Sequence, residues 1–98
     1  MAKLNSEEIA QALKSLIGWE YKDNAIRKLF RFSAFMEGIQ FINQIAGEAE
    51  AMDHHPDITI NYTRITFVCT SHDMGGVTER DLKLARAIED AYVARSVN

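Results

Sequence analysis

Three histidines are the residues of this sequence whose type and spacing could do chemistry. Two of them, His54 and His55, are adjacent, and the third, His72, lies 17 positions after the second. An imidazole titrates near neutrality, so it can both donate and accept a proton at physiological pH. Acid–base chemistry on a small molecule is therefore one function that the three imidazoles could serve.

Two other interpretations stay open on the residues alone. Three histidines can hold a zinc ion, but adjacent residues seldom both ligate one ion, and neither a His-x-x-x-His nor a Cys-x-x-Cys spacing is present. We therefore expect no metal. The histidines could also serve only as hydrogen-bonding groups around turns. The nearby carboxylates of Glu50, Asp53 and Asp73 favour a chemical role over this structural one.

The elements around the histidines are expected to bring them together. Residues 58–62 and 65–69 alternate apolar and polar side chains, and Thr63-Arg64 lies between them, which predicts a hairpin. The adjacent histidines precede the first strand, and His72 follows the second. Because antiparallel pairing places the start of one strand beside the end of the other, the three imidazoles should gather in one cleft.

The rest of the chain predicts a second hairpin and three helices. The expected helices cover residues 5–18, 33–52 and the segment after Thr78, and the other hairpin covers residues 19–32. Asn5, Ser33 and Thr78 are the expected N-caps, with Asp81 completing a capping box. The order α-β-β-α-β-β-α predicts an α+β fold, with helices packed on one face of an antiparallel four-stranded sheet and a single domain over residues 1–98.

Two of the expected helices carry apolar stripes that we expect to pack in the core. The stripe of the longest helix recurs at intervals of three and four residues and consists of Phe35, Ile39, Ile42, Ala46 and Ala49, with Phe41 and Ile45 at its margin. The stripe of the last helix consists of Leu84, Ala85, Ile88, Ala91 and Tyr92.

The composition is that of an ordinary globular domain without an excess of basic residues. Of 98 residues, 47% are hydrophobic and 26% charged, and the net charge is −3. Nucleic acid binding depends largely on Lys and Arg neutralising phosphates, so we expect no direct DNA or RNA binding. No run of about 18 apolar residues predicts a membrane helix. Glu7 and Glu8 do not suit a secretory signal, so the expected location is cytoplasmic.

A single cysteine, Cys69, excludes an intrachain disulfide. It lies in an apolar strand-like run, where we expect a buried and inert thiol. A reactive thiolate would need a histidine or a helix N-terminus beside it. The position of His72 three residues later keeps that alternative open.

The residues around the histidines resemble the pterin-4a-carbinolamine dehydratases. The resemblance runs from about Gly18-Trp19 to the last helix. It is strongest at Ala49-Glu50, His54-His55-Pro56-Asp57, Tyr62, Ser71-His72-Asp73-Met74-Gly75-Gly76-Val77-Thr78 and Asp81. A double histidine followed by proline, coupled at this distance to a His-Asp-x-Gly-Gly turn, is a specific pattern. Ser71 stands where the family usually has threonine.

The resemblance implies dehydration of a 4a-hydroxytetrahydropterin, the product of aromatic amino acid hydroxylases, to the quinonoid dihydropterin. Hydroxide leaves C4a while N5 loses its proton, so the site needs one acid and one base. The N5 lone pair assists the departure, so neither a metal nor an organic cofactor is expected. His54, His55 and His72 are the expected catalytic residues, with His54 and His72 as the acid–base pair in an order left open.

The resemblance also implies substrate contacts and partners. The expected substrate-binding residues are Glu50, Asp53, Pro56, Asp73 and Asp81. Glu50 and Asp53 could instead orient imidazoles, and Asp81 could be only the capping carboxylate of the last helix. A homo-dimer or homo-tetramer is expected. The alternative function is a non-enzymatic scaffold on the same fold that binds other proteins, as a coactivator or an assembly factor.

Overall fold

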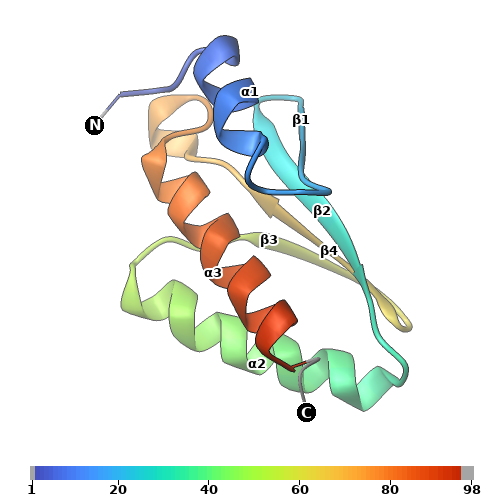
Figure 1. The fold of residues 1–98 in the computed structure, drawn as a ribbon. Helices are drawn as coiled ribbons and strands as arrows, with labels where there is room; N and C mark the ends of the chain where they lie inside the picture. Colours follow the sequence, from blue (N-terminus) through green and yellow to red (C-terminus); the bar gives the residue numbers. More distant parts are fainter. Residues whose placement is uncertain (1, 96–98) are drawn as a thin grey trace.

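The structure is a computed structural model that describes residues 2–95, in which three α-helices pack on a four-stranded antiparallel sheet (Figure 1). The elements in chain order are α1 (Ser6–Leu13), β1 (Glu20–Lys22), β2 (Ala25–Arg31), α2 (Phe35–Ala51), β3 (Asp57–Asn61), β4 (Arg64–Cys69), the 3₁₀ helix η1 (His72–Met74) and α3 (Glu79–Arg95). In Figure 1 the helices lie on one face of the sheet and leave its other face open. The predicted α+β fold and element order are confirmed.

The sheet joins the two predicted hairpins through their second strands. The strand order is β1-β2-β4-β3, so β2 pairs with β4 and β3 is an edge strand. Ile26, Phe30, Ile65, Phe67 and Cys69 face the helices, and each is at most 1% exposed. This alternation matches the period-two pattern of a sheet with one buried face.

Phe30 of β2 lies at the centre of the core. Its ring contacts those of Trp19, Phe41, Phe67 and Tyr92, with centroid distances from 4.8 to 6.1 Å. Three of these four contacts are edge-to-face, an arrangement that aromatic rings prefer. The core thus joins β2 and β4 to both long helices.

The apolar stripe predicted for α2 is confirmed at Ala49 and at its margin residues Phe41 and Ile45, but the phase of its predicted centre is wrong. Phe35 is 43% exposed, and Ala46 is also exposed. The buried residues of α2 are Gly38, Phe41, Ile45 and Ala49. A Cβ at Gly38 would lie 2.7 Å from Cδ1 of Ile65, so glycine allows α2 to approach β4 closely. The sequence pattern favoured large side chains and could not show that the buried stripe contains a glycine.

Helix α1 begins as predicted and ends early. The side chain of Asn5 accepts from the N–H of Glu8 at 2.8 Å, and the Glu8 carboxylate accepts from the N–H of Asn5 at 2.9 Å. This is a complete capping box. The helix ends at Leu13, five residues before the predicted Gly18, whose φ of +89° turns the chain toward β1.

Ser33 does not cap α2, contrary to the prediction. The N-cap is Ala34, because Phe32 still donates its N–H to the carbonyl of Thr63 and the chain stays extended for one more residue. Glu37, in the first turn of the helix, binds Ser33 instead. Its carboxylate accepts from the N–H and the hydroxyl of Ser33 at 2.9 and 3.0 Å, and these bonds lower the pKa of Glu37.

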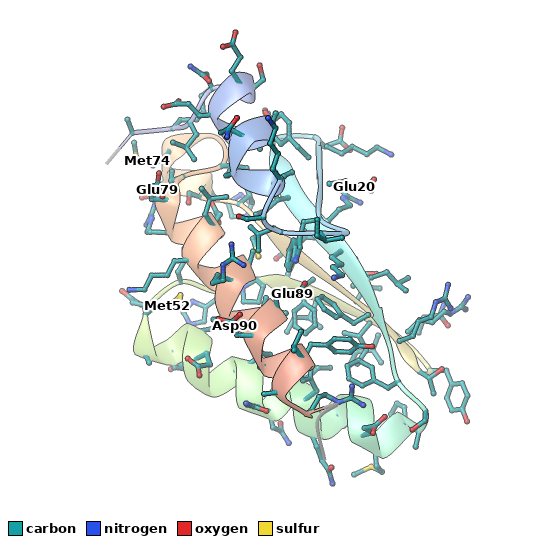
Figure 2. The ribbon with its side chains drawn as sticks, viewed as in Figure 1. Glu20, Met52, Met74, Glu79, Glu89 and Asp90 are labelled. Atoms are coloured by element: carbon teal, nitrogen blue, oxygen red, sulfur yellow. The ribbon has the colours of Figure 1, made fainter. Side chains whose placement is uncertain are left out.

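Helix α3 buries the predicted residues Leu84, Ala85, Ile88 and Ala91, whereas Tyr92 is half-buried. Figure 2 shows Glu89 on α3, where its carboxylate accepts from Nζ of Lys28 at 2.8 Å and from Nε1 of Trp19 at 3.0 Å. Within residues 2–95, none of the helices combines the length and the apolar character needed to cross a membrane.

Candidate active site

All three histidines line one open hollow of about 370 Å³. Its lining residues are Asp53, His54, His55, Pro56, Asp57, Thr70, His72 and Asp73. They come from the turn between α2 and β3, the start of β3, and the segment that follows β4. Figure 2 labels Met52, which follows α2, and Met74, which lies in η1. The predicted convergence of the histidines is confirmed.

The turn after α2 fixes the position of His54. The N–H of His54 donates to the carbonyl of Ala49 at 3.1 Å, and that of Asp53 donates to the carbonyl of Glu50 at 3.2 Å. Asp53 has a φ of +50°, a left-handed conformation that aspartate tolerates better than most residues. This turn reverses the chain, so that His54 faces inward and the next residues lead into β3.

His54 is bound to a fully buried carboxylate. Its Nε2 lies 2.6 Å from Oδ1 of Asp81, whose side chain is 0% exposed. The other oxygen, Oδ2, accepts from the hydroxyl of Ser71 at 2.8 Å and from the N–H of Thr78 at 2.9 Å. A buried carboxylate needs such donors to offset its lost hydration. Three donors from different segments therefore converge on Asp81.

This network orients the imidazole of His54. Because the carboxylate of Asp81 is an acceptor when ionised, Nε2 must carry the proton that joins them. In neutral His54 the lone pair is then on Nδ1, which has no hydrogen-bond partner among residues 2–95. This tautomer assignment follows from the hydrogen bonds. His54 can thus offer Nδ1 as a proton acceptor.

His72 lies in a short turn that follows β4. Ser71 pairs with Gly76 as an isolated bridge, and η1 occupies the space between them. Gly75 has a φ of +74°, which only glycine adopts without strain, and its N–H donates to the carbonyl of His72 at 3.2 Å. The closed turn holds the exposed His72 at the rim of the hollow.

His55 and Glu50 form an exposed pair beside the hollow. Nε2 of His55 lies 2.5 Å from Oε2 of Glu50, and both side chains are more than half exposed. Glu50 is not among the lining residues of the hollow. Its position matches the predicted alternative in which it orients an imidazole.

Asp73 is held by Arg80 at the opposite rim. Nη2 of Arg80 donates to Oδ1 of Asp73 at 2.7 Å, and this bond is the main reason why the pKa of Asp73 is lowered. Nε of Arg80 is buried and has no partner among the described residues. Arg80 also lines a second hollow of about 200 Å³, together with Met52, His54, Glu79 and Lys83.

The predicted substrate-binding residues fall into two groups. Asp53, Pro56 and Asp73 line the hollow, as their predicted role requires. Glu50 and Asp81 do not line it: Glu50 binds His55, and Asp81 lies buried beneath His54 as both the anchor of that imidazole and the capping carboxylate of α3.

Sequence reasoning missed several residues of the site. Asp57 and Thr70 line the hollow, Ser71 binds Asp81, and Arg80 binds Asp73. Asp57 and Ser71 belong to the segments of the family resemblance, which was the available signal. Nothing in the spacing pointed to Arg80.

Among residues 2–95, no three His, Cys, Asp or Glu side chains are grouped so that they could hold a metal ion.

Known protein sequences are similar to this chain over almost its whole length. The sequence profile of the family described as pterin 4 alpha carbinolamine dehydratase matches residues 2–91, which contain every residue of the hollow. This chain belongs to that family. A Mycobacterium sp. (strain KMS) protein, provisionally named a pterin-4-alpha-carbinolamine dehydratase, is 46% identical over 90 residues, covering 92% of this chain and 96% of the relative. A Thermomicrobium roseum protein with the same provisional name is 42% identical over 90 residues, covering 92% and 97%.

Solved structures give the same fold for members of the pterin-4a-carbinolamine dehydratase family. A Brucella melitensis protein, described as a transcriptional coactivator/pterin dehydratase, superposes with a TM-score of 0.87 at 36% identity, covering 91% of this chain and 97% of its own. A pterin dehydratase-like protein described as a RuBisCO assembly factor in the alpha-carboxysome superposes with a TM-score of 0.61 at 18% identity, covering 74% and 84%. That second likeness concerns the fold alone.

Proposed function

We propose that this protein dehydrates a 4a-hydroxytetrahydropterin to the quinonoid dihydropterin by histidine acid–base catalysis. The observation that carries the proposal is the pair of His54 and buried Asp81, which opens onto the same hollow as His55 and His72. Membership of the dehydratase family supports it. A volume of about 370 Å³ lies within the usual range for small-molecule sites.

In the proposed reaction His54 is the base and His72 the acid. Nδ1 of His54 accepts the proton of N5, and the N5 electron pair forms the C4a=N5 double bond. The C4a–O bond breaks as His72 donates a proton to the leaving hydroxide, which departs as water. Positioned proton transfer typically contributes about 10²–10⁴-fold in rate, a sensible scale for an intermediate that decays unaided.

The remaining groups position the heterocycle in this proposal. His55, held by Glu50, lies against one edge of the pterin, and Asp53 or Asp73 accepts from its amino-pyrimidinone N–H groups. Asp81 acts through His54 and is a positioning residue. No metal or organic cofactor takes part, because the N5 electron pair itself expels the leaving group.

Substitution of the two histidines tests the proposal. His54→Ala and His72→Ala should each lower the enzymatic rate about 100-fold or more, because each removes one proton-transfer group. The measurement is stopped-flow absorbance of freshly generated 4a-hydroxytetrahydropterin, corrected for its unaided decay. Asn43→Ala, at an exposed position of α2, is the control, and circular dichroism checks folding. Near-normal turnover by both histidine variants would contradict the proposal.

A protein-binding role is the second candidate, favoured by one surface of this chain and by one relative. The rings of Phe35 and Tyr62 stack at 6.5 Å while remaining 43% and 71% exposed, and Met36 beside them is 59% exposed. The Brucella melitensis relative is described as a coactivator as well as a dehydratase. A stoichiometric protein partner in a pull-down, together with absence of pterin turnover, would favour this candidate over the enzyme.

A further inference from the structure

The sheet face that the helices leave open is rich in arginine (Figure 1). Directly paired residues of antiparallel strands share a face, and successive residues of a strand alternate between faces. Because Ile26, Phe30 and Phe67 face the helices, the residues between them and their cross-strand partners form the open face. The charged residues at these register positions are Glu20, Lys22, Arg27, Arg31, Asp57 and Arg64. Four cations against two carboxylates give the open face a net charge of +2, although the whole chain carries −3.

Two arginines stand directly opposite each other at one end of the open face. Arg31 of β2 pairs with Arg64 of β4, both are exposed, and neither has an ion-pair partner in the described part of the chain. Like charges in this arrangement destabilise a sheet. A carboxylate bound between the two guanidinium groups would remove the repulsion, and guanidinium binds a carboxylate through two parallel N–H···O bonds. The pair is therefore suited to an anionic group from outside the chain.

Arg27 extends this basic surface along β2. Its Nε is buried and has no hydrogen-bond partner among residues 2–95, and it forms no ion pair with Glu20, its cross-strand neighbour. Arg31 lies four positions later on the same strand, a spacing of roughly 13 Å. Leu29 lies between them and is 44% exposed, and Arg27 and Leu29 line an open hollow of about 420 Å³. An extended chain lying along β2 would meet one cation, an apolar side chain and then two cations.

We infer that the open face binds an acidic protein segment in an extended conformation, with carboxylates on Arg27 and on the pair of Arg31 and Arg64. A second copy of this chain does not fit, because face-to-face contact would oppose the same positive charges. Single-stranded nucleic acid fits poorly, since no aromatic residue stands at these register positions to stack on a base. A membrane would find Leu29 as the one large exposed apolar side chain of the open face. This interaction does not depend on the proposed dehydration.

A fluorescein-labelled peptide in which glutamate alternates with threonine is the probe, because this alternation places every carboxylate on one side of an extended chain. Fluorescence anisotropy should show saturable binding at low salt that weakens as salt is raised. The double variant Arg31→Gln/Arg64→Gln should bind about tenfold more weakly, since it removes both guanidinium groups. Lys14→Gln/Lys83→Gln is the matched control, because it removes two exposed positive charges outside the open face. Absence of binding by the wild type, or an equal loss in both double variants, overturns the inference.

Thermal unfolding and two competing probes complete the test. Because Arg31→Gln/Arg64→Gln removes a like-charge pair, its Tm should equal or exceed that of the wild type. A lower Tm would overturn the repulsion on which the inference rests. The wild type should bind the glutamate peptide more tightly than a single-stranded RNA of the same charge or phosphatidylserine vesicles. Equal or tighter binding of either competitor overturns the assignment of a protein partner.

Discussion

At the scale of single residues, Asp81 explains how a distant part of the chain completes the site. It is separated from His54 by 27 positions, yet its Oδ1 lies 2.6 Å from Nε2 of that histidine. Its other oxygen binds Ser71 and Thr78, so the carboxylate cannot turn away from the imidazole. The same logic holds a histidine in one tautomer in the Ser-His-Asp triad.

Asp81→Asn should therefore impair catalysis more than folding. An amide can present an N–H to His54 in place of a carboxylate oxygen, which favours protonation on Nδ1 and removes the free lone pair. We expect kcat to fall about 100-fold or more. Long-range ¹⁵N–¹H correlation spectra should show the proton on Nε2 in the wild type and a changed tautomer in the variant. A variant with unchanged kcat and tautomer would contradict the assigned role.

The burial of Cys69 should make the stability of the fold depend on pH. Burial raises the pKa of its thiol far above its ordinary value of about 9, so the folded protein keeps a proton that the unfolded chain loses in alkali. Stability is thus retained below pH 9 and lost above it, by about 1.4 kcal/mol per pH unit. Denaturant unfolding between pH 8 and pH 10.5 measures this slope. Cys69→Ala should abolish the contribution, and an identical slope in that variant would exclude it.

The candidate site was only partly predictable from the sequence, because some of its contacts follow from local strand pairing and others from the packing of separate elements. The gathering of His54, His55 and His72 follows from hairpin pairing, which sequence alternation reveals. The bond between Arg80 and Asp73, and that between Ser71 and Asp81, depend on where the first turn of α3 lies against the loop after β4. No periodicity encodes that placement. The inert thiol expected for Cys69 agrees with its complete burial.

At the scale of elements, the turn containing η1 depends on one glycine. Gly75→Ala would place a Cβ at a φ of +74°, which should cost about 1 kcal/mol and shift the turn that carries His72. We expect a lower Tm and a lower kcat. Thermal unfolding and stopped-flow turnover measure the two effects. Unchanged values for both would show that the turn does not need this conformation.

Gly47 offers the matched control for that substitution. It lies exposed within α2, and a Cβ there would meet nothing within 4 Å. Gly47→Ala should stabilise the protein by up to about 1 kcal/mol through helix propensity, with unchanged turnover. The two variants add the same methyl group, so opposite shifts in Tm isolate the backbone conformation as the cause.

Element types were easier to predict than their ends and faces. Strand alternation and the capping signal at Asn5 gave the hairpins and the start of α1, because these are local effects. The end of α1 at Leu13, the N-cap at Ala34 and the phase of the buried stripe in α2 differed from expectation. Each depends on tertiary contacts, such as the close packing of Gly38 on β4, that override local preference.

At the scale of the whole molecule, the exposed apolar surface of Phe35, Met36, Ile60 and Tyr62 is where we expect copies of this chain to associate. A domain of 98 residues buries a modest fraction of its surface, and association would cover more. Met36→Lys should shift the protein toward the monomer, because a desolvated charge would oppose the contact. Analytical ultracentrifugation measures the change.

Ile17→Lys is the control for that experiment. Ile17 is 75% exposed and follows α1, outside the surface just defined. This variant should keep the oligomeric state of the wild type. A monomeric wild type would contradict the expected association. Equal effects of both substitutions would show that the contact does not depend on the surface of Phe35, Met36, Ile60 and Tyr62.

Because the two oxygens of Asp81 bind His54 on one side and Ser71 and Thr78 on the other, the proposed mechanism also depends on helix α3. Residues 54, 55 and 72 would all be present in a chain that stops before residue 79, yet such a chain would lack the carboxylate of Asp81 that binds His54. During synthesis, the site should therefore become able to catalyse the proposed reaction only after α3 has folded against the loop that follows α2. Fraying of the first turn of that helix would break the bond between Asp81 and His54, so that the imidazole could adopt the other tautomer while all three histidines remained in place.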